Sequence, residues 1–186
     1  AYTDESNLIT NAGVVGADVT GVGTDRHLLA ACSFGGDKGI FGFGYTGSVT
    51  GVSNLVSNAG VVATDVSAVG TARSTLAACE FGDDTAIFAY GDTGSVSSLS
   101  NLVSNSGVVA TDVSGVGTAR KNIAACSYGE DKGIFAYGYT GGNVSMSNLV
   151  SNTGVVGTDV SGVGTARRAL AATQYGYDKG IFAFGE

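Results

Sequence analysis

The chain has 186 residues, of which 44% are hydrophobic and only 13% are charged, so it can bury a core and does not have the composition of a disordered protein. Its net charge of −7 argues against binding to a nucleic-acid backbone, which needs clustered Lys and Arg side chains. No apolar run approaches the roughly 20 residues of a membrane-spanning helix, and the polar opening AYTDES does not resemble a signal peptide, which leaves export open because a leader is removed from a mature protein.

The dominant signal in the sequence is an internal repeat with a period of 47 residues. The string SNLVSN begins at Ser53, Ser100 and Ser147, and its variant SNLITN begins at Ser6. A period in the forties is typical of four-stranded propeller blades or of helical repeats, and 31 glycines without a proline favour strands. We therefore predict one all-β domain over residues 1–186, a four-bladed β-propeller. Its repeats are expected at residues 7–53, 54–100, 101–147 and 148–186.

Each copy is predicted to contain four strands and a segment that crosses to the next blade. Runs of β-branched, aromatic and small residues mark the strands, and Gly, Ser and Asp residues mark the turns between them. The inner strand is rich in alanine, and small side chains let strands crowd around an axis. In the second copy, the inner, second, third and outer strands and the crossing segment are expected at residues 75–81, 86–91, 101–105, 108–113 and 115–120.

The second strand of each copy indicates how the blades should stack. Side chains alternate between the two faces of a strand, so in the first copy we expect Phe41, Phe43 and Tyr45 on one bulky face. Gly42 should lie on the opposite, hollow face. A blade with one bulky and one hollow face stacks on a copy of itself, and each buried aromatic side chain contributes roughly 1.5–3 kcal/mol.

The phase of the repeat predicts that the two ends of the chain share one blade. The chain opens with a third and a fourth strand, over residues 7–19, and ends with a first and a second strand, over residues 167–185. Together these halves make one blade, so we expect them to pair and to close the ring without an open sheet edge. A ring shared between two chains is the alternative.

The repeats resemble kelch-type repeats. A kelch blade has an Arg, a small-residue strand, an aromatic strand that ends in glycine and then a strand pair, and the third copy reads TARKNIAACSYGEDKGIFAYGYTGG. The copies are most similar to the kelch-like repeats of virion and tail-associated proteins of aquatic bacteriophages, which share TAR, a small-residue strand and G-aromatic-x-aromatic-G. This resemblance implies a structural or adhesive module that lies outside the cell or on a virion surface.

Three cysteines occupy equivalent inner-strand positions, Cys32, Cys79 and Cys126, and Thr173 takes this position in the fourth copy. Zinc sites usually draw on close Cys pairs, which the chain lacks, and an odd number of cysteines cannot pair completely in disulfides. We therefore interpret these cysteines as small buried residues rather than as a metal cluster, and we expect no cofactor and no metal.

One Asp and one Arg per copy are the most regular charges. Arg suits bidentate pairing with a carboxylate, so the favoured interpretation is a structural pair that ties the crossing segment to the blade edge. The alternative is a ring of ligand-binding charges at one mouth of the propeller. The positions are Asp18, Asp65, Asp112 and Asp159, and Arg26, Arg73, Arg120 and Arg167.

Ligand or partner contacts are expected at loops and strand ends where the copies differ, because loops on a rigid scaffold carry function. The candidates are Tyr45, Asp92, Tyr139 and Tyr177, whose tyrosine rings would stack on sugars. The only histidine, His27, has no histidine counterpart in the other copies, and no acid–base pair stands outside the repeat. We therefore expect no catalytic residue and no enzymatic activity.

The sequence predicts a non-enzymatic structural protein that assembles with itself, such as a filament or virion-decoration subunit. Near-identical copies create repeated surface patches, and head-to-tail contacts that do not close produce fibres. A homo-oligomer is therefore expected, without nucleic acid and without membrane insertion. The alternative is a lectin-like propeller whose repeated weak sites bind glycans through avidity.

Overall fold

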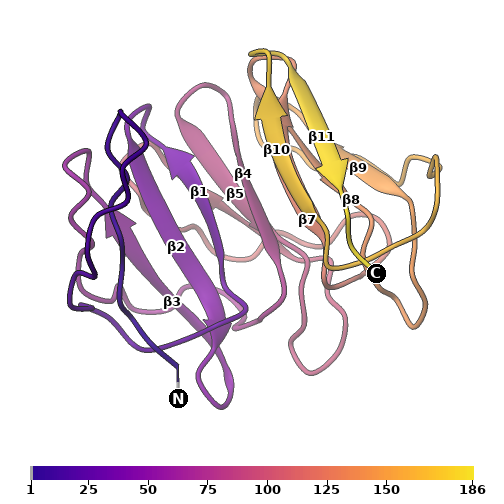
Figure 1. Cartoon of the computed structure of the whole chain (residues 1–186). Helices are drawn as coiled ribbons and strands as arrows, with labels where there is room; N and C mark the ends of the chain where they lie inside the picture. The colour runs from indigo at the N-terminus through magenta and orange to yellow at the C-terminus, as the bar shows by residue number, and fades with distance from the viewer. Residues whose placement is uncertain (1) are drawn as a thin grey trace.

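The computed structural model describes residues 2–186, and β-strands are the only regular secondary structure in this part of the chain. The strands form four small antiparallel sheets, one in each repeat (Figure 1). Three sheets have three strands in chain order, and the fourth consists of two strands. The strands are β1 Ala30–Phe34, β2 Lys38–Tyr45, β3 Val49–Val56, β4 Ala77–Phe81, β5 Thr85–Ala89, β6 Ser100–Val103, β7 Ala124–Tyr128, β8 Lys132–Ala136, β9 Ser147–Val150, β10 Ala171–Tyr175 and β11 Lys179–Ala183.

The all-β architecture in 47-residue repeats agrees with the prediction, and in the second repeat the first three strands lie within two residues of their predicted bounds. The turn predicted at residues 82–84 joins β4 to β5, with Phe81 opposite Thr85. Gly82 and Asp83 have φ angles of +60° and +69° there. Gly reaches this left-handed region at no steric cost and Asp tolerates it, so the sequence of the turn matches its geometry. Within residues 2–186, no helix has the length and hydropathy that crossing a membrane requires.

The predicted outer strand is not a continuous strand. In the second repeat, the segment after β6 forms two isolated bridges with it, Ser100 with Val113 and Val103 with Val109, and the amide of Ala110 donates to the carbonyl of Leu102. Between these bridges, the side-chain amide of Asn101 donates to the main-chain carbonyl of Ala110 at 2.9 Å. A side-chain hydrogen bond therefore takes the place of part of the backbone ladder.

The second strand of the first repeat contains a β-bulge that breaks the predicted alternation of side chains. The pairing of β2 with β3 shifts between Gly42 and Gly44, and Phe43 between them has a φ angle of +62°. A left-handed residue reverses the direction in which the following side chains point. Phe41 and Phe43 consequently face different neighbours, and the prediction that they share one face is wrong.

The second repeat shows the same division of aromatic side chains between the two faces. Phe88 packs on Phe43 of the first repeat, and Tyr90 packs on Phe135 of the third, with ring centroids 5.2 and 5.5 Å apart. Gly42 provides the space that Phe88 needs, because a Cβ atom at Gly42 would lie 2.7 Å from its ring. The sheet of the second repeat is therefore bulky on both faces. Glycine also makes room for a cysteine, because a Cβ atom at Gly133 would lie 2.6 Å from Sγ of Cys79.

The sheets stack through their inner strands in the order β1, β4, β7 and β10 (Figure 1). One apolar cluster lies between the first two sheets and a second between the next two, around Phe88 and Phe135 respectively. At the hairpin turns, the amide of Gly82 donates to the carbonyl of Asp131 in the next repeat at 2.8 Å, and equivalent bonds join the other neighbouring repeats. Contacts between neighbouring repeats thus build the core.

The two ends of the chain do not share a sheet in this structure. Among the described residues, β10 and β11 pair with each other, and the N-terminal segment bridges to itself, Ser6 with Val19 and Ile9 with Val15. The strands β1 and β10 do not pack together as neighbouring inner strands do. The N-terminal segment lies beside the sheet of β1, away from β10 and β11 (Figure 1). Ring closure is therefore not shown, and the array carries an N-terminal half-repeat, residues 6–19, and a C-terminal half-repeat, residues 167–185.

Candidate functional site

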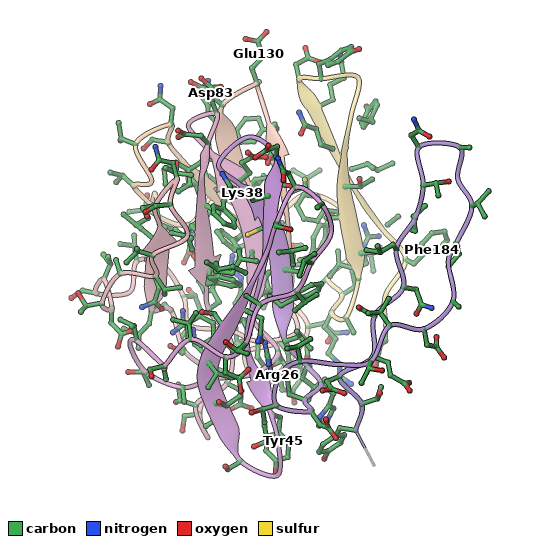
Figure 2. All side chains as sticks on the ribbon, turned by 90° about the vertical axis from the view of Figure 1, so that its left-hand side faces the viewer. Arg26, Lys38, Tyr45, Asp83, Glu130 and Phe184 are labelled. Carbon is green, nitrogen blue, oxygen red and sulfur yellow. The ribbon has the colours of Figure 1, made fainter. Side chains whose placement is uncertain are left out.

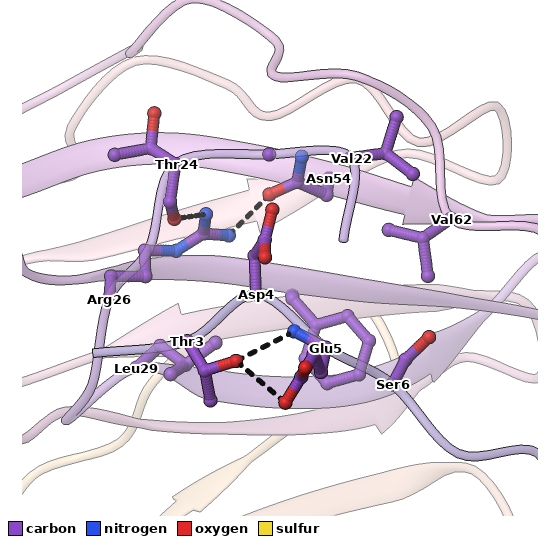
Figure 3. A pocket seen from close by; sticks show the side chains of 12 residues that line it. Thr3, Asp4, Glu5, Ser6, Val22, Thr24, Arg26, Leu29, Asn54 and Val62 are labelled. Carbon is purple, nitrogen blue, oxygen red and sulfur yellow. Dashed lines mark hydrogen bonds between the residues drawn. The ribbon is translucent and has the colours of Figure 1, made fainter. Parts of the chain in front are cut away.

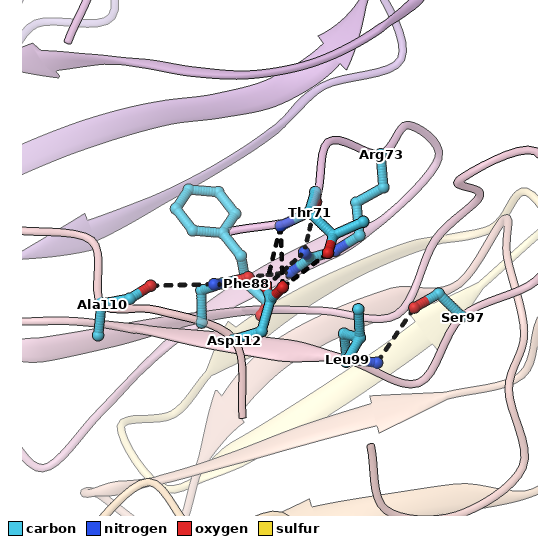
Figure 4. Close-up of polar contacts among 8 residues, drawn as sticks. Thr71, Arg73, Phe88, Ser97, Leu99, Ala110 and Asp112 are labelled. Atoms are coloured by element: carbon cyan, nitrogen blue, oxygen red, sulfur yellow. Dashed lines mark hydrogen bonds and ion pairs between the residues drawn. The ribbon is translucent and has the colours of Figure 1, made fainter. Parts of the chain in front are cut away.

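A buried cluster of polar side chains lies at each internal junction between repeats (Figure 4). In the second repeat, Arg73 donates through Nη2 to Oδ1 of Asn101 at 2.5 Å and through Nη1 to the carbonyl of Thr71 at 3.1 Å. Asn101 donates to Oδ1 of Asp112 at 3.0 Å. The amide and hydroxyl of Thr71 both donate to the same carboxylate. Four residues from three segments of the chain are held together in this way.

The same cluster recurs in the first and third repeats with matching geometry. In all three clusters, Nη1 of the Arg and Oδ1 of the Asp lie 3.8 Å apart. The side chains of Arg73 and Arg120 are fully buried, and the Arg26 side chain is almost so. The structure therefore buries these Arg side chains and leaves their Asp partners at the surface, with about 30% of each Asp side chain exposed. The equivalent sets are Thr24, Arg26, Asn54 and Asp65, and Thr118, Arg120, Asn148 and Asp159.

The cluster perturbs the pKa of both charged partners. Burial lowers the pKa of Arg73 to about 10 against the opposing effect of Asp112, so its guanidinium remains protonated at neutral pH. Burial raises the pKa of Asp112, but hydrogen bonds from Thr71 and Asn101 and the charge of Arg73 outweigh it, and the pKa lies below its ordinary value. Hydrogen bonds from Thr71 and Asn101 therefore stabilise the carboxylate, whereas Nε of the buried Arg73 has no hydrogen-bond partner among the described residues.

An aromatic ring of the preceding repeat lies against the buried guanidinium groups of Arg73 and Arg120. Cζ of Arg73 lies 4.3 Å from the ring centroid of Phe43, and Arg120 lies at the same distance from Tyr90. Such cation–π contacts contribute about 2 kcal/mol when desolvated. The ring-bearing residues have positive φ angles, which cost about 1–2 kcal/mol and point the ring toward the next repeat. These residues are Phe43, Tyr90, Tyr137 and Phe184, with φ angles of +62°, +65°, +63° and +63°.

The fourth polar cluster is divided between the two ends of the array. At the N-terminal end, Asn7 donates to Oδ1 of Asp18 at 2.8 Å, as the equivalent Asn and Asp do elsewhere. At the C-terminal end, Nη2 of Arg167 donates to the carbonyl of Phe182 at 3.3 Å. Among the described residues, no Arg reaches Asn7 and no Asn reaches Arg167, so each end presents half of a cluster.

The fourth aromatic contact is divided in the same way. Phe184 is 87% exposed, whereas Phe43 at the equivalent position is 1% exposed. At the other end, Arg26 borders a pocket of about 220 Å³ that Leu29 and Phe41 also line (Figure 3). Phe41 is 38% exposed there, although its equivalent Phe88 is fully buried. Thr3, Asp4 and Glu5 of the N-terminal segment also line this pocket.

Three of the predicted ligand-contact residues occupy equivalent positions at the end of the second strand. The carboxylate of Asp92 forms an ion pair with Lys121 of the next repeat. The guanidinium of Arg168 lies 4.8 Å from the ring centroid of Tyr139. Tyr45 is half-buried and its ring contacts His27 edge-on, with centroids 5.5 Å apart. These side chains therefore contribute to contacts within and between repeats.

Tyr177 lies elsewhere, in the turn between β10 and β11, and is 91% exposed. Its equivalents in the second and third repeats are Asp83 and Glu130. Figure 2 shows these two turn residues at one edge of the array and Tyr45 at the opposite edge. The structure thus does not bring the four predicted contact residues together into one site.

The cysteines lie on the inner strands, and burial raises the pKa of all three thiols. Cys79 and Cys126 are buried and Cys32 is partly buried. Within the part of the chain that the structure describes, no group of three or more His, Cys, Asp or Glu side chains is arranged to hold a metal ion. The candidate site is therefore the pair of exposed half-repeats.

Comparison with known proteins adds no relative: no protein-family model matches this chain, and no curated protein matches it. The functional argument therefore depends on the arrangement of the repeats themselves.

Proposed function

We propose that the protein is a non-enzymatic structural module that assembles end to end with copies of itself, outside the cell or on a virion surface. One observation carries the proposal: the N-terminal half-repeat supplies third- and fourth-strand segments, and the C-terminal half-repeat supplies first and second strands. The end of one copy therefore complements the beginning of the next. Contacts between unlike surfaces that do not close generate filaments.

Exposed apolar surface at the C-terminal end supports the same proposal. Ala171 and Thr173 on β10 are exposed, whereas their equivalents Ala77 and Cys79 on β4 are buried by the next repeat. Exposed apolar patches of this kind mark interaction sites, and their burial contributes about 25 cal/mol per Å². The edge of β11 also presents unpaired backbone groups to which another strand can add.

The two half-repeats would also complete one sheet if a single chain closed into a four-bladed propeller. In a closed ring the two half-repeats of one chain would make the same contacts with each other that neighbouring copies would make in a filament. The two forms would therefore differ in the mass of the particle and not in the residues in contact. The resemblance of the copies to kelch-like repeats of bacteriophage virion proteins supports a structural role in either form. We favour assembly between copies because the two half-repeats lie at opposite ends of the array.

Sedimentation velocity and electron microscopy of the purified chain over a wide range of concentrations test this function. We expect the average mass to rise with concentration and linear particles to appear whose length grows in steps of one array. A folded protein that stays monomeric at the highest concentration would contradict self-assembly, and a compact ring in the images would identify closure within one chain.

A further inference from the structure

We propose that the junction between two copies reproduces the internal junctions residue by residue. In this junction, Arg167 of one copy binds Asn7 of the next copy, and Phe184 of the first copy lies under Arg26 of the next. This inference rests on the proposed self-assembly and adds the register of the interface to it.

The polar part of the register follows from the spacing within the internal clusters. Arg73 binds the Asn that lies 28 residues later, and Thr71 binds the Asp that lies 41 residues later. Asn7 is the repeat equivalent of Asn54, Asn101 and Asn148, so it is the Asn position that Arg167 would bind in a following copy. The bond between Asn7 and Asp18 has already formed, so the acceptor half of the cluster is preorganised.

The aromatic part of the register follows from the backbone of Phe184. Its φ angle of +63° matches that of Phe43, although among the described residues no guanidinium covers its ring. A left-handed aromatic residue is unfavourable by itself, and in the internal repeats this conformation directs the ring under the next Arg. In the proposed junction, the ring would enter the pocket beside Arg26, which Thr3 and Asp4 of the N-terminal segment also line (Figure 3).

Two further contacts follow from the same register. Phe88 packs against Gly42 of the preceding repeat, so Phe41 of the next copy should pack against Ala183. The amide of Gly129 donates to the carbonyl of Asp178 at 2.7 Å, so the equivalent amide of Gly176 should donate to Asp37 of the next copy. Polar, aromatic and backbone contacts therefore agree on one alignment of the two copies.

Two variants that each damage one end test this register. Phe184→Asp blocks the C-terminal end, and the double variant Asn7→Arg/Asp18→Arg blocks the N-terminal end by placing positive charge opposite Arg167. All three positions are exposed in the single chain, so the fold should persist, which circular dichroism checks. Val108→Asp, at an apolar position that is 64% exposed and lies far along the chain from both ends, serves as the control.

Each blocked variant should lower the association constant by at least about thirtyfold, the loss typical of an interface hot spot, and Val108→Asp should leave it unchanged. An equimolar mixture of the two blocked variants should form a one-to-one dimer through the remaining intact ends. This complementation distinguishes unlike ends from the pairing of like ends, in which a single blocked variant would dimerise alone.

The outcomes separate the register from the proposed function. If the unmodified chain assembles and both blocked variants assemble equally well, or if one variant dimerises alone, the register is wrong although self-assembly stands. If the unmodified chain is monomeric and the mixture gives no dimer, both the register between copies and self-assembly fail.

Discussion

The guanidinium of Arg73 lies 4.3 Å from the ring centroid of Phe43, a residue of the preceding repeat whose backbone is left-handed. The same Arg binds Asn101 on β6. One side chain therefore connects an aromatic residue of one repeat to the polar cluster of the next. The contact recurs at each internal junction and is divided between the two ends of the array.

Replacement of Phe43 by Ala should destabilise the single chain far more than replacement of Phe184 by Ala. Phe43→Ala removes a buried ring beneath Arg73, so it should lower the free energy of unfolding by about 3–5 kcal/mol. Phe184→Ala removes an exposed ring and should change it by about 0.5 kcal/mol or less. Urea unfolding of both variants, at a concentration too low for association, measures the difference. Equal losses would contradict the burial that separates the two positions.

Asn101→Ala should destabilise the protein because it leaves the buried charge of Arg73 without its shortest hydrogen bond. Hydrogen bonds to charged groups contribute about 1.5–3 kcal/mol, and we expect a loss of free energy of unfolding in this range. Asn7→Ala is the matched control, since among the described residues no Arg reaches Asn7. Its effect in dilute solution should be under about 1 kcal/mol. A similar loss in both variants would indicate that the Arg–Asn bond does not stabilise the fold.

The stability of the protein should fall in acid. Burial opposes ionisation of Asp65, Asp112 and Asp159, but hydrogen bonds and an Arg hold each pKa below its ordinary value. A carboxyl with a lowered pKa in the folded state stabilises that state above its unfolded pKa, and this stabilisation is lost as pH falls through the folded pKa. Urea midpoints should therefore decrease between about pH 4 and pH 2. Asp112→Asn should flatten this pH dependence, and an unchanged profile in that variant would count against a role for this carboxylate.

The three thiols should react slowly with a disulfide reagent in the native protein. Burial raises the pKa of Cys32 to about 12 and that of Cys79 well above its ordinary value, so little reactive thiolate forms at neutral pH. In denaturant, three thiols should react rapidly. Cys79→Ala supplies the control, with two thiols after unfolding. Rapid, complete labelling of the native protein would contradict the position of these residues between the stacked sheets.

The sequence was sufficient to predict the repeat, the strand class and the turn after Phe81. These three predictions were confirmed because they depend on local features: the repeat shows as a strict spacing, and Gly and Asp residues mark the turn. The bulge at Phe43 could not be predicted, because an aromatic residue between two glycines also fits an ordinary alternating strand. Ring closure could not be settled either. The phase of the repeat identifies which half is missing at each end, but it does not say whether the same chain or another provides it.

The sequence also predicts part of the candidate site. The regular Arg and Asp positions were recognised, and three such pairs lie within contact distance in the structure. The Asn residues that join them were missed, although Asn54 and Asn101 show the same period, because an Asn at the start of a strand resembles a common turn residue. The sequence pattern identifies Phe184 only as an aromatic residue of the last second strand. Its exposure depends on whether another repeat packs beyond it in space, which the sequence of one chain does not specify.

The hydrogen bonds at the hairpin turns, such as that from Gly82 to Asp131, use only backbone atoms and need no particular side chain. Every junction also uses the same aromatic–Arg contact, so any repeat that keeps these two positions can follow any other. A gene for such a chain can gain or lose whole units of 47 residues by recombination, while its surface loops diverge independently. The length of the array is thus free to evolve separately from the chemistry displayed along it.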